Sequence, residues 1–151
     1  MRPKHFTIAE LVDPAILQKH GEEECWKMLD PKILTALDFL RDKFGKTTVN
    51  GMYLGHKFTE SGLRRKDTAT GAPNSTHKLG QGMDAKMHDV EESVVYDWIL
   101  ANQAEAYRVG IRRVEDIAFT GRKGGGGWLH IDCKDTGPDW VNKIQVVKPK
   151  K

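Results

Sequence analysis

Apolar residues recur with helical spacing in a central stretch of the chain, and polar residues mark its ends. Asp30 precedes Pro31, and Gly45 closes the stretch. The apolar side chains between them recur every three or four positions: Ile33, Leu34, Leu37, Leu40 and Phe44. Because Asp caps helices, Pro fits a first turn and Gly ends helices, the pattern predicts a core helix over residues 31–44.

Capping patterns predict two further helices. Thr7 and Glu10 have the spacing of a capping box ahead of an apolar pair, which indicates a short helix beginning there. Asp89 and Glu92 open another helix in the same way. Its apolar stripe has helical spacing and predicts core residues: Val94, Val95, Trp98 and Ile99.

Short apolar runs bounded by turn residues predict strands. Thr47–Asn50 and Met52–Leu54 form the first candidate pair, and a polar loop from Lys57 to Thr76 follows, of a length typical of functional or mobile loops. Ile111–Phe119 and Trp128–Cys133 predict a second pair with a glycine-rich connection. The chain therefore predicts an α+β fold, in which a small antiparallel sheet carries the functional site and is flanked by helices.

Length and charge restrict the organisation and the partners. The chain has 151 residues, enough for a single domain over residues 1–151, with a core at about 6–136 and a basic tail at 141–151. The net charge of +3 is modest, and no basic stripe is interleaved with aromatic residues. We therefore expect no nucleic-acid partner.

The chain also lacks the sequence features of membrane and secreted proteins. No run of about 18 apolar residues is present, so no membrane span is predicted. Residues 1–5 lack the apolar core of a signal peptide, and we expect a protein that is cytoplasmic when made. In that compartment Cys25 and Cys133 are expected to be reduced thiols.

Candidate chemistry is concentrated in three residues. His77 and Asp84 flank a segment with two glycines that allow a tight turn, and His130 lies on the predicted strand after Trp128. Two imidazoles and a carboxylate are the ligand set of an open zinc site, whose fourth position holds water that the metal acidifies for hydrolysis. The alternative is that these histidines are ordinary surface or hydrogen-bonded residues.

The pattern Ser-x-His-x-x-Gly-x-x-x-Asp at residues 75–84, followed by His-x-Asp at 130–132, resembles the zinc D-Ala-D-Ala carboxypeptidase family. That family includes phage endolysins, the vancomycin-resistance dipeptidase and the Hedgehog domain. The resemblance covers about residues 6–136 and implies His77, Asp84 and His130 as ligands of Zn²⁺. It also implies that Arg64, in the segment Ser-Gly-Leu-Arg, lies by the active site. A guanidinium there can stabilise an oxyanion or hold a substrate carboxylate, whereas the alternative is a surface salt bridge.

The general base of the family is missing from its usual positions. Relatives place a glutamate three residues, or a histidine two residues, before the last zinc-binding histidine, where this chain has Gly127 and Trp128. If the last two predicted strands pair about a centre near residues 122 and 123, Glu115 lies opposite His130, on the face of the metal ligands. Glu115 is therefore the candidate base.

The same pairing places Arg113 opposite Asp132. A slip of one residue would turn Glu115 away and bring Asp116 forward. A solvated Glu115 paired with Arg112 or Arg113 is the alternative.

Two further residues are expected to support the metal ligands. Asp132 is predicted to accept a hydrogen bond from a ligand imidazole or to pair with an arginine, since a fourth protein ligand would close the site. Ser75 is predicted to order the turn before His77 by a hydrogen bond to the backbone.

The resemblance implies a zinc peptidase that cuts peptidoglycan stem peptides, either as a D-Ala-D-Ala carboxypeptidase or as an L,D-endopeptidase. A small chain without a signal peptide is similar to phage or prophage lysis enzymes, which act on the cell wall after release and depend on a holin for access. The alternatives are a non-catalytic zinc-binding module, which the missing base favours, and a phage structural protein with the same fold.

Overall fold

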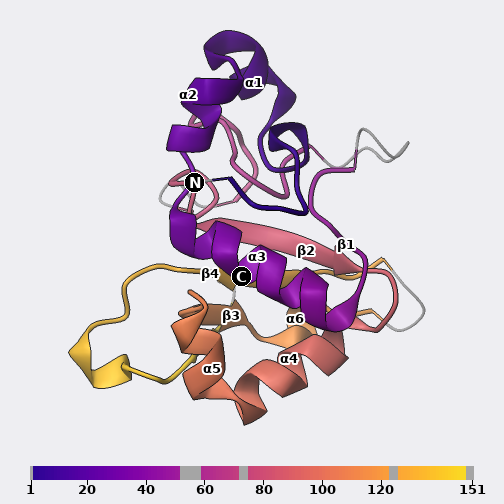
Figure 1. Cartoon of the computed structure of the whole chain (residues 1–151), viewed down its shortest axis with the longest axis vertical. Helices are drawn as coiled ribbons and strands as arrows, with labels where there is room; N and C mark the ends of the chain where they lie inside the picture. Colours follow the sequence, from indigo (N-terminus) through magenta and orange to yellow (C-terminus); the bar gives the residue numbers. More distant parts are fainter. Residues whose placement is uncertain (1, 52–58, 72–74, 123–125, 149–151) are drawn as a thin grey trace.

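A computed structural model describes residues 2–51, 59–71, 75–122 and 126–148. Its helices and strands follow one another as η1 (Ile8–Glu10), α1 (Pro14–His20), α2 (Glu22–Lys27), α3 (Pro31–Phe44), β1 (Thr47–Thr48), β2 (Gly82–Met87), α4 (Glu92–Ala101), α5 (Gln103–Arg108), β3 (Arg113–Glu115), α6 (Ile117–Thr120), β4 (Leu129–Asp132), η3 (Pro138–Trp140) and β5 (Gln145–Val147). The fold is α+β, as the sequence predicted (Figure 1).

The five described strands form one mixed sheet in the order β1-β2-β4-β3-β5. The first three pairings are antiparallel, but β3 and β5 are parallel. The prediction of a purely antiparallel sheet was therefore wrong. The reason is the segment 133–144, which reverses the chain after β4 and returns it beyond β3, so that β5 runs in the same direction as β3. Residues 145–147, which we expected in a basic tail, supply this strand.

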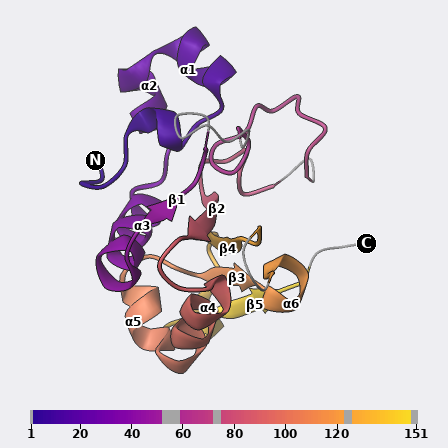
Figure 2. The ribbon, with the colours of Figure 1, turned by 90° about the vertical axis from the view of Figure 1, so that its right-hand side faces the viewer.

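Helices cover the sheet and form the core with it. α3 packs on β1 and β2, whereas α4 and α6 pack on β4 (Figure 2). The core faces of the two central strands carry alternate apolar side chains that are fully or almost fully buried: Met83, Ala85, Met87, Leu129 and Ile131. Because side chains alternate along a strand, the intervening residues of β2 and β4 point to the other face, where the candidate site lies.

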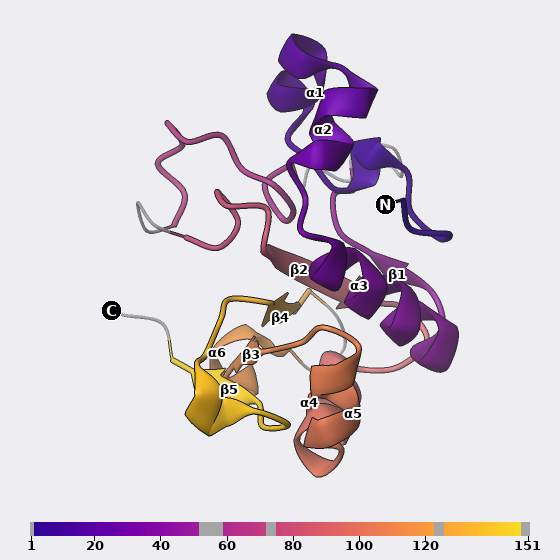
Figure 3. The same cartoon turned by 60° about the vertical axis from the view of Figure 1, so that its left-hand side comes forward.

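α1 and α2 lie at one end of the molecule, beyond the sheet, and residues 59–71 lie beside them (Figure 3). A bridge between Val12 and Leu63 joins the chain ahead of α1 to that segment. The buried Asn50 amide strengthens the junction, since it donates to the carbonyl of Val12 at 2.8 Å and accepts from the backbone N–H of Ser61 at 3.0 Å. These contacts fix the segment that leads to Arg64.

The predicted core helix is confirmed, including its ends. The Asp30 carboxylate accepts from the backbone N–H of Lys32 at 2.9 Å, and Gly45 ends the helix with a φ of 94°. The short helix at Thr7 forms as the 3₁₀ helix η1, and the Glu10 carboxylate accepts from the Thr7 N–H at 2.7 Å.

Two details of α4 differ from prediction. α4 begins after Glu91, and the Asp89 carboxylate instead accepts from the backbone N–H of Lys46 at 2.9 Å, which ties the helix start to the chain before β1. Val95 and Ile99 are buried as predicted, but Val94 is 48% exposed because it lies at the edge of the stripe.

The strand predicted over Ile111–Phe119 was too long. β3 ends at Glu115, and the Asp116 carboxylate caps α6 by accepting from the N–H of Ala118 at 3.0 Å. Asp is a strong N-cap, and this local hydrogen bond competes with continuation of the strand.

Some expectations fall on residues outside the described ranges: the strand at Met52–Leu54, parts of the long loop at residues 57–58 and 72–74, and residues 123–125 of the glycine-rich connection. Cys25 and Cys133 are buried free thiols, as predicted. Among the described helices, none combines the length and apolar character needed to cross a bilayer.

Candidate metal centre

Two central strands place an acid and a histidine side by side. Asp84 on β2 is the direct cross-strand partner of His130 on β4, and Nδ1 of His130 lies 3.0 Å from Oδ1 of Asp84. Both side chains are on the sheet face opposite the apolar core. The antiparallel register therefore fixes two of the three predicted ligands.

His77 reaches the same point from the turn that precedes β2. The Ser75 hydroxyl accepts from the backbone N–H of His77 at 3.3 Å, so Ser75 orders this turn as predicted. Nδ1 of His77 is 3.0 Å from the carbonyl oxygen of Gly62, and its Nε2 is 3.2 Å from Oδ1 of Asp84. The His77 side chain is 3% exposed, so water does not replace these contacts.

The hydrogen bonds of the two rings determine which ring atoms face each other. The Gly62 carbonyl can only accept, so Nδ1 of His77 carries a proton and Nε2 points at Asp84. Nε2 of His130 is 2.9 Å from a carboxylate oxygen of Asp132, which leaves Nδ1 of His130 toward Asp84. One ligand atom from each of the three residues lies within 4.8 Å of the others. Two ring nitrogens therefore converge on the Asp84 carboxylate. Without a proton or a cation between them, the lone pairs of the nitrogens would face the negative oxygen. The group can hold a metal ion.

Asp132 and Arg113 hold His130 from behind. The Asp132 side chain is fully buried and accepts two-pronged hydrogen bonds from the Arg113 guanidinium at 2.9–3.1 Å. Arg113 is the cross-strand partner of Asp132, as the predicted register required. Burial acts to raise the pKa of Asp132, but the hydrogen bonds from His130 and Arg113 outweigh it and lower the pKa. The charged form of the Asp132 carboxylate is therefore favoured, and it faces the outer nitrogen of His130.

The protein raises the pKa of His130 and lowers that of Asp84. Burial opposes the imidazolium form, but the carboxylates of Asp132 and Asp84 raise the pKa of His130 to about 10. Burial likewise disfavours the charged form of Asp84, but hydrogen bonds from His130 and His77 lower its pKa well below the ordinary value. The surroundings of Asp84 therefore favour a positive charge next to its carboxylate.

Arg64 lies beside the group, and its position is set by backbone contacts. Its Nη2 is 3.3 Å from Oδ2 of Asp84, and its Nε donates to the carbonyl of Glu60 at 2.6 Å. The Arg64 N–H donates to the carbonyl of His77 at 3.1 Å, and its side chain is 10% exposed. Arg64 is thus not a surface salt-bridge residue. It contacts the Asp84 oxygen that faces away from the two histidines.

Glu115 is the last residue of β3 and directly follows Val114, which pairs with Ile131 on β4. Burial raises the pKa of Glu115 above its ordinary value, and the nearby charges of His130 and Asp84 act on it with opposite signs. The structure records no hydrogen bond from Glu115 to any of the three converging residues, nor an ion pair with Arg112 or Arg113. Its electrostatic coupling to the group is what keeps it a candidate base.

Two glycines make the close approach of these segments possible. A Cβ on Gly82 would lie 2.3 Å from the Thr76 hydroxyl and 3.2 Å from the His130 ring. Gly80 has a φ of 70°, and a Cβ there would lie 1.9 Å from the carbonyl oxygen of Met28. The sequence indicated a tight turn at these positions, and the structure adds that both lack room for a side chain.

A cleft of about 270 Å³ opens beside the group. It is bordered by Asp84, Arg64, Glu60, Ser61, Lys86 and Trp128, with two threonines. Sequence reasoning missed Lys86, although it shares the β2 face of Asp84 by simple alternation. Its ammonium group donates to the Val49 carbonyl at 2.7 Å and to the Ser61 hydroxyl, and burial lowers its pKa to about 8.

Comparisons with known proteins identify no relative: no protein-family model, curated protein or solved structure matches the chain. The resemblance noted above therefore rests on short motifs and stays a prediction.

Proposed function

We propose that the chain is a zinc-dependent peptidase that cleaves peptidoglycan stem peptides. The observation that carries the proposal is the convergence of His77, Asp84 and His130 within 4.8 Å, next to a cleft that reaches Asp84. Three protein ligands leave one coordination position open, which is the arrangement of catalytic rather than structural zinc sites.

The donor set and its spacing fit zinc. In a tetrahedral site with metal–ligand distances of about 2.0–2.1 Å, ligand atoms lie about 3.3 Å apart. The two measured separations from Oδ1 of Asp84, 3.0 Å to His130 and 3.2 Å to His77, are close to that value. Each ring also has an acceptor on its outer nitrogen, as metal-binding histidines usually do. Imidazole with carboxylate is a set that zinc accepts readily.

The remaining steps of hydrolysis need a base and a stabiliser of negative charge. When bound, zinc supplies Lewis-acid activation of a water molecule and of the scissile carbonyl. Glu115 accepts the proton of the attacking water and returns it to the leaving amine, a role that suits a carboxylate with a raised pKa. Arg64, which borders the cleft, stabilises the oxyanion or holds a substrate carboxylate.

The substrate class comes from the motif resemblance. Residues 75–84 and 130–132 are similar to those of enzymes that cut either the terminal D-Ala-D-Ala bond or a bond within the stem peptide. A phage or prophage lysis enzyme, reaching the wall with the help of a holin, is the biological setting that we propose.

Mass spectrometry of synthetic stem peptides incubated with the zinc-loaded protein tests this function. We expect two product peptides whose masses identify the bond, and no products when a chelator is present. Intact peptide after long incubation with the zinc-loaded protein would contradict the proposal.

One observation favours a second function, that of a non-catalytic zinc-binding module. Trp128 borders the cleft where relatives carry a histidine base, and Glu115 has no hydrogen bond to the converging group. In that case the zinc-loaded protein would bind wall fragments without cutting them.

A further inference from the structure

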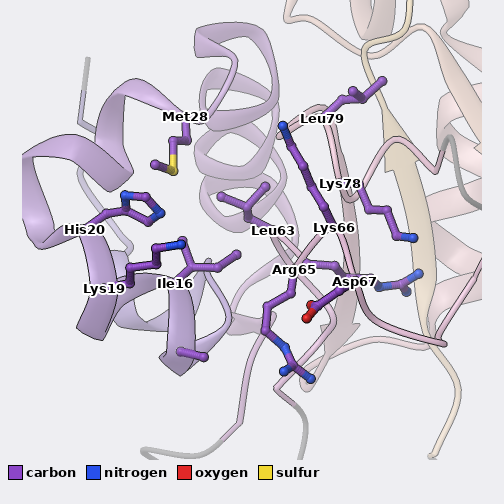
Figure 4. Close-up of a pocket in the computed structure, with 12 residues that line it drawn as sticks. Ile16, Lys19, His20, Met28, Leu63, Arg65, Lys66, Asp67, Lys78 and Leu79 are labelled. Carbon is purple, nitrogen blue, oxygen red and sulfur yellow. The ribbon is translucent and has the colours of Figure 1, made fainter.

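A second, larger pocket lies on the other side of Arg64. It has a volume of about 770 Å³ and is enclosed by α1, the residue that follows α2, and residues 63–67 and 78–79 (Figure 4). Its floor is apolar and includes Ile16, Met28 and Leu63. Five cationic side chains surround that floor: Lys19, Arg64, Arg65, Lys66 and Lys78. We call this the basic pocket.

Most of the positive charge in the basic pocket is not neutralised. The two arginines are engaged, Arg64 with Asp84 at 3.3 Å and Arg65 with Asp13 at 3.2 Å. Among the residues that the structure describes, neither Lys19 nor Lys66 forms an ion pair or a side-chain hydrogen bond. Within the described part of the chain, the one hydrogen bond of the Lys78 ammonium group is a long one, to the backbone carbonyl of Thr68 at 3.5 Å. Three lysines therefore line a pocket in which Asp67 is the one carboxylate among the described lining residues.

The two lysines without partners approach the pocket from opposite sides. Lys19 extends from α1 toward its centre, and Lys66 extends from the facing loop (Figure 4). Arg64 borders both the basic pocket and the cleft beside Asp84, so the two spaces are neighbours. A peptide that runs from the cleft past Arg64 would therefore reach the basic pocket.

We propose that the basic pocket binds a carboxylate-bearing part of the peptide substrate, at a distance from the scissile bond. The inference rests on the proposed function. The apolar floor accommodates the aliphatic part of a peptide, and the ammonium groups attract its carboxylate as point charges. Among the described residues that line the pocket, none is Phe, Tyr or Trp, so it lacks the large stacking surfaces that single-stranded nucleic acids use.

The test compares two stem pentapeptides that differ only in the glutamyl α-carboxyl group, which is free in one and amidated in the other. Calorimetry with the whole protein in chelator measures binding without turnover, and the zinc-loaded protein gives kcat/KM for each peptide. We expect the free carboxylate to bind roughly two- to fivefold more tightly than the amide, as exposed charge pairs do. That preference should shrink as salt is raised.

The double variant Lys19→Gln/Lys66→Gln should lose the preference for the free carboxylate. A matched control, Lys143→Gln/Lys148→Gln, removes the same charge from exposed residues near β5 and should keep it. If the two peptides bind equally and are cleaved equally, the basic pocket does not bind the carboxylate, whereas the proposed peptidase activity stands.

Other outcomes separate the two proposals. Preferential binding of the free carboxylate without any cleavage by the zinc-loaded protein would overturn the peptidase and keep the basic pocket. Neither binding nor cleavage would overturn both. Tighter binding of poly(glycerol phosphate), with no preference between the peptides, would show that the pocket serves a phosphate polymer and overturn the inference.

Discussion

His130 lies directly across the β2–β4 ladder from Asp84, with its Nδ1 atom 3.0 Å from Oδ1 of that carboxylate. The backbone hydrogen bonds of two buried strands fix this pair, so two ligands of the candidate metal site are in place before an ion binds. His77 alone comes from a turn, and the Gly62 carbonyl and the Ser75 hydroxyl hold it there. Such preorganisation lowers the cost of metal binding.

Removing the charge behind His130 should weaken zinc binding. Asp132 contacts the outer nitrogen of His130 at 2.9 Å, and loss of such a partner typically costs about 10- to 100-fold in metal affinity. We expect Asp132→Asn to fall in that range, measured by competition with a chelator of known affinity. Arg113→Gln keeps the Asp132–His130 contact and should cost less. Unchanged affinity in Asp132→Asn would show that Asp132 supports only the fold.

Replacing the candidate base should separate chemistry from metal binding. Glu115→Gln is expected to lower kcat about 10²- to 10⁴-fold while zinc content stays the same, because the amide cannot accept the proton of the attacking water. Asp116→Asn is the matched control, since Asn can still cap α6. If Glu115→Gln keeps full activity with zinc bound, Glu115 has no part in the reaction.

The metal-free protein should lose stability as the pH rises from about 6.5 to 8. The folded state raises the pKa of His130 from 6.5 to about 10, so it keeps a proton that the unfolded chain releases in this range. The bound proton of His130 stabilises the folded state fully below about pH 6.5, and this stabilisation is lost as the pH rises toward 10. Above about pH 8 the lowered pKa of Lys86 contributes with the opposite sign.

Urea unfolding in chelator at pH 6.5 and 8 measures this effect. His130→Ala should flatten the pH dependence between those two values. An equally steep decline in His130→Ala would assign the proton to another group.

A glycine pair can separate the cost of steric collision from that of backbone strain. Gly137 has a φ of 85°, a ψ of 174° and open space around it, so Gly137→Ala should lower the free energy of unfolding by about 1–3 kcal/mol through backbone strain alone. Gly80 has a similar φ but touches the Met28 carbonyl, so Gly80→Ala should cost about 3 kcal/mol or more. Thermal or urea unfolding compares the two. Equal costs would mean that the Met28 segment moves away freely.

Local rules predicted those parts of the fold whose causes are local. The Asp30 cap and the Gly45 stop fixed α3, and strand alternation placed His130 and Asp132 on one face. The pairing of Arg113 with Asp132 was predicted by assuming that the two strands pair about a centre near residues 122 and 123, and it is confirmed. By contrast, the parallel β5 depends on a long connection that carries no periodic signal, and the Asp116 cap stopped β3 inside an otherwise strand-like run.

The candidate site was predictable only in part. Asp84 and His130 could be identified because their residue types and spacing match a metal-binding motif. The Gly62 carbonyl behind His77 could not, because a backbone acceptor leaves no mark in the side-chain sequence. Lys86 could not be placed because no strand was predicted over residues 82–87, where β2 puts it on the face of Asp84.

Zinc content measured by native mass spectrometry tests the metal centre most directly. The proposal predicts one zinc ion bound to the unmodified chain and none bound to His77→Ala, Asp84→Ala or His130→Ala, each with unchanged circular dichroism. His20→Ala, which alters a histidine outside the group, should bind zinc like the unmodified chain. A folded chain that takes up no zinc, or variants that still bind it with full affinity, would contradict the proposed metal centre.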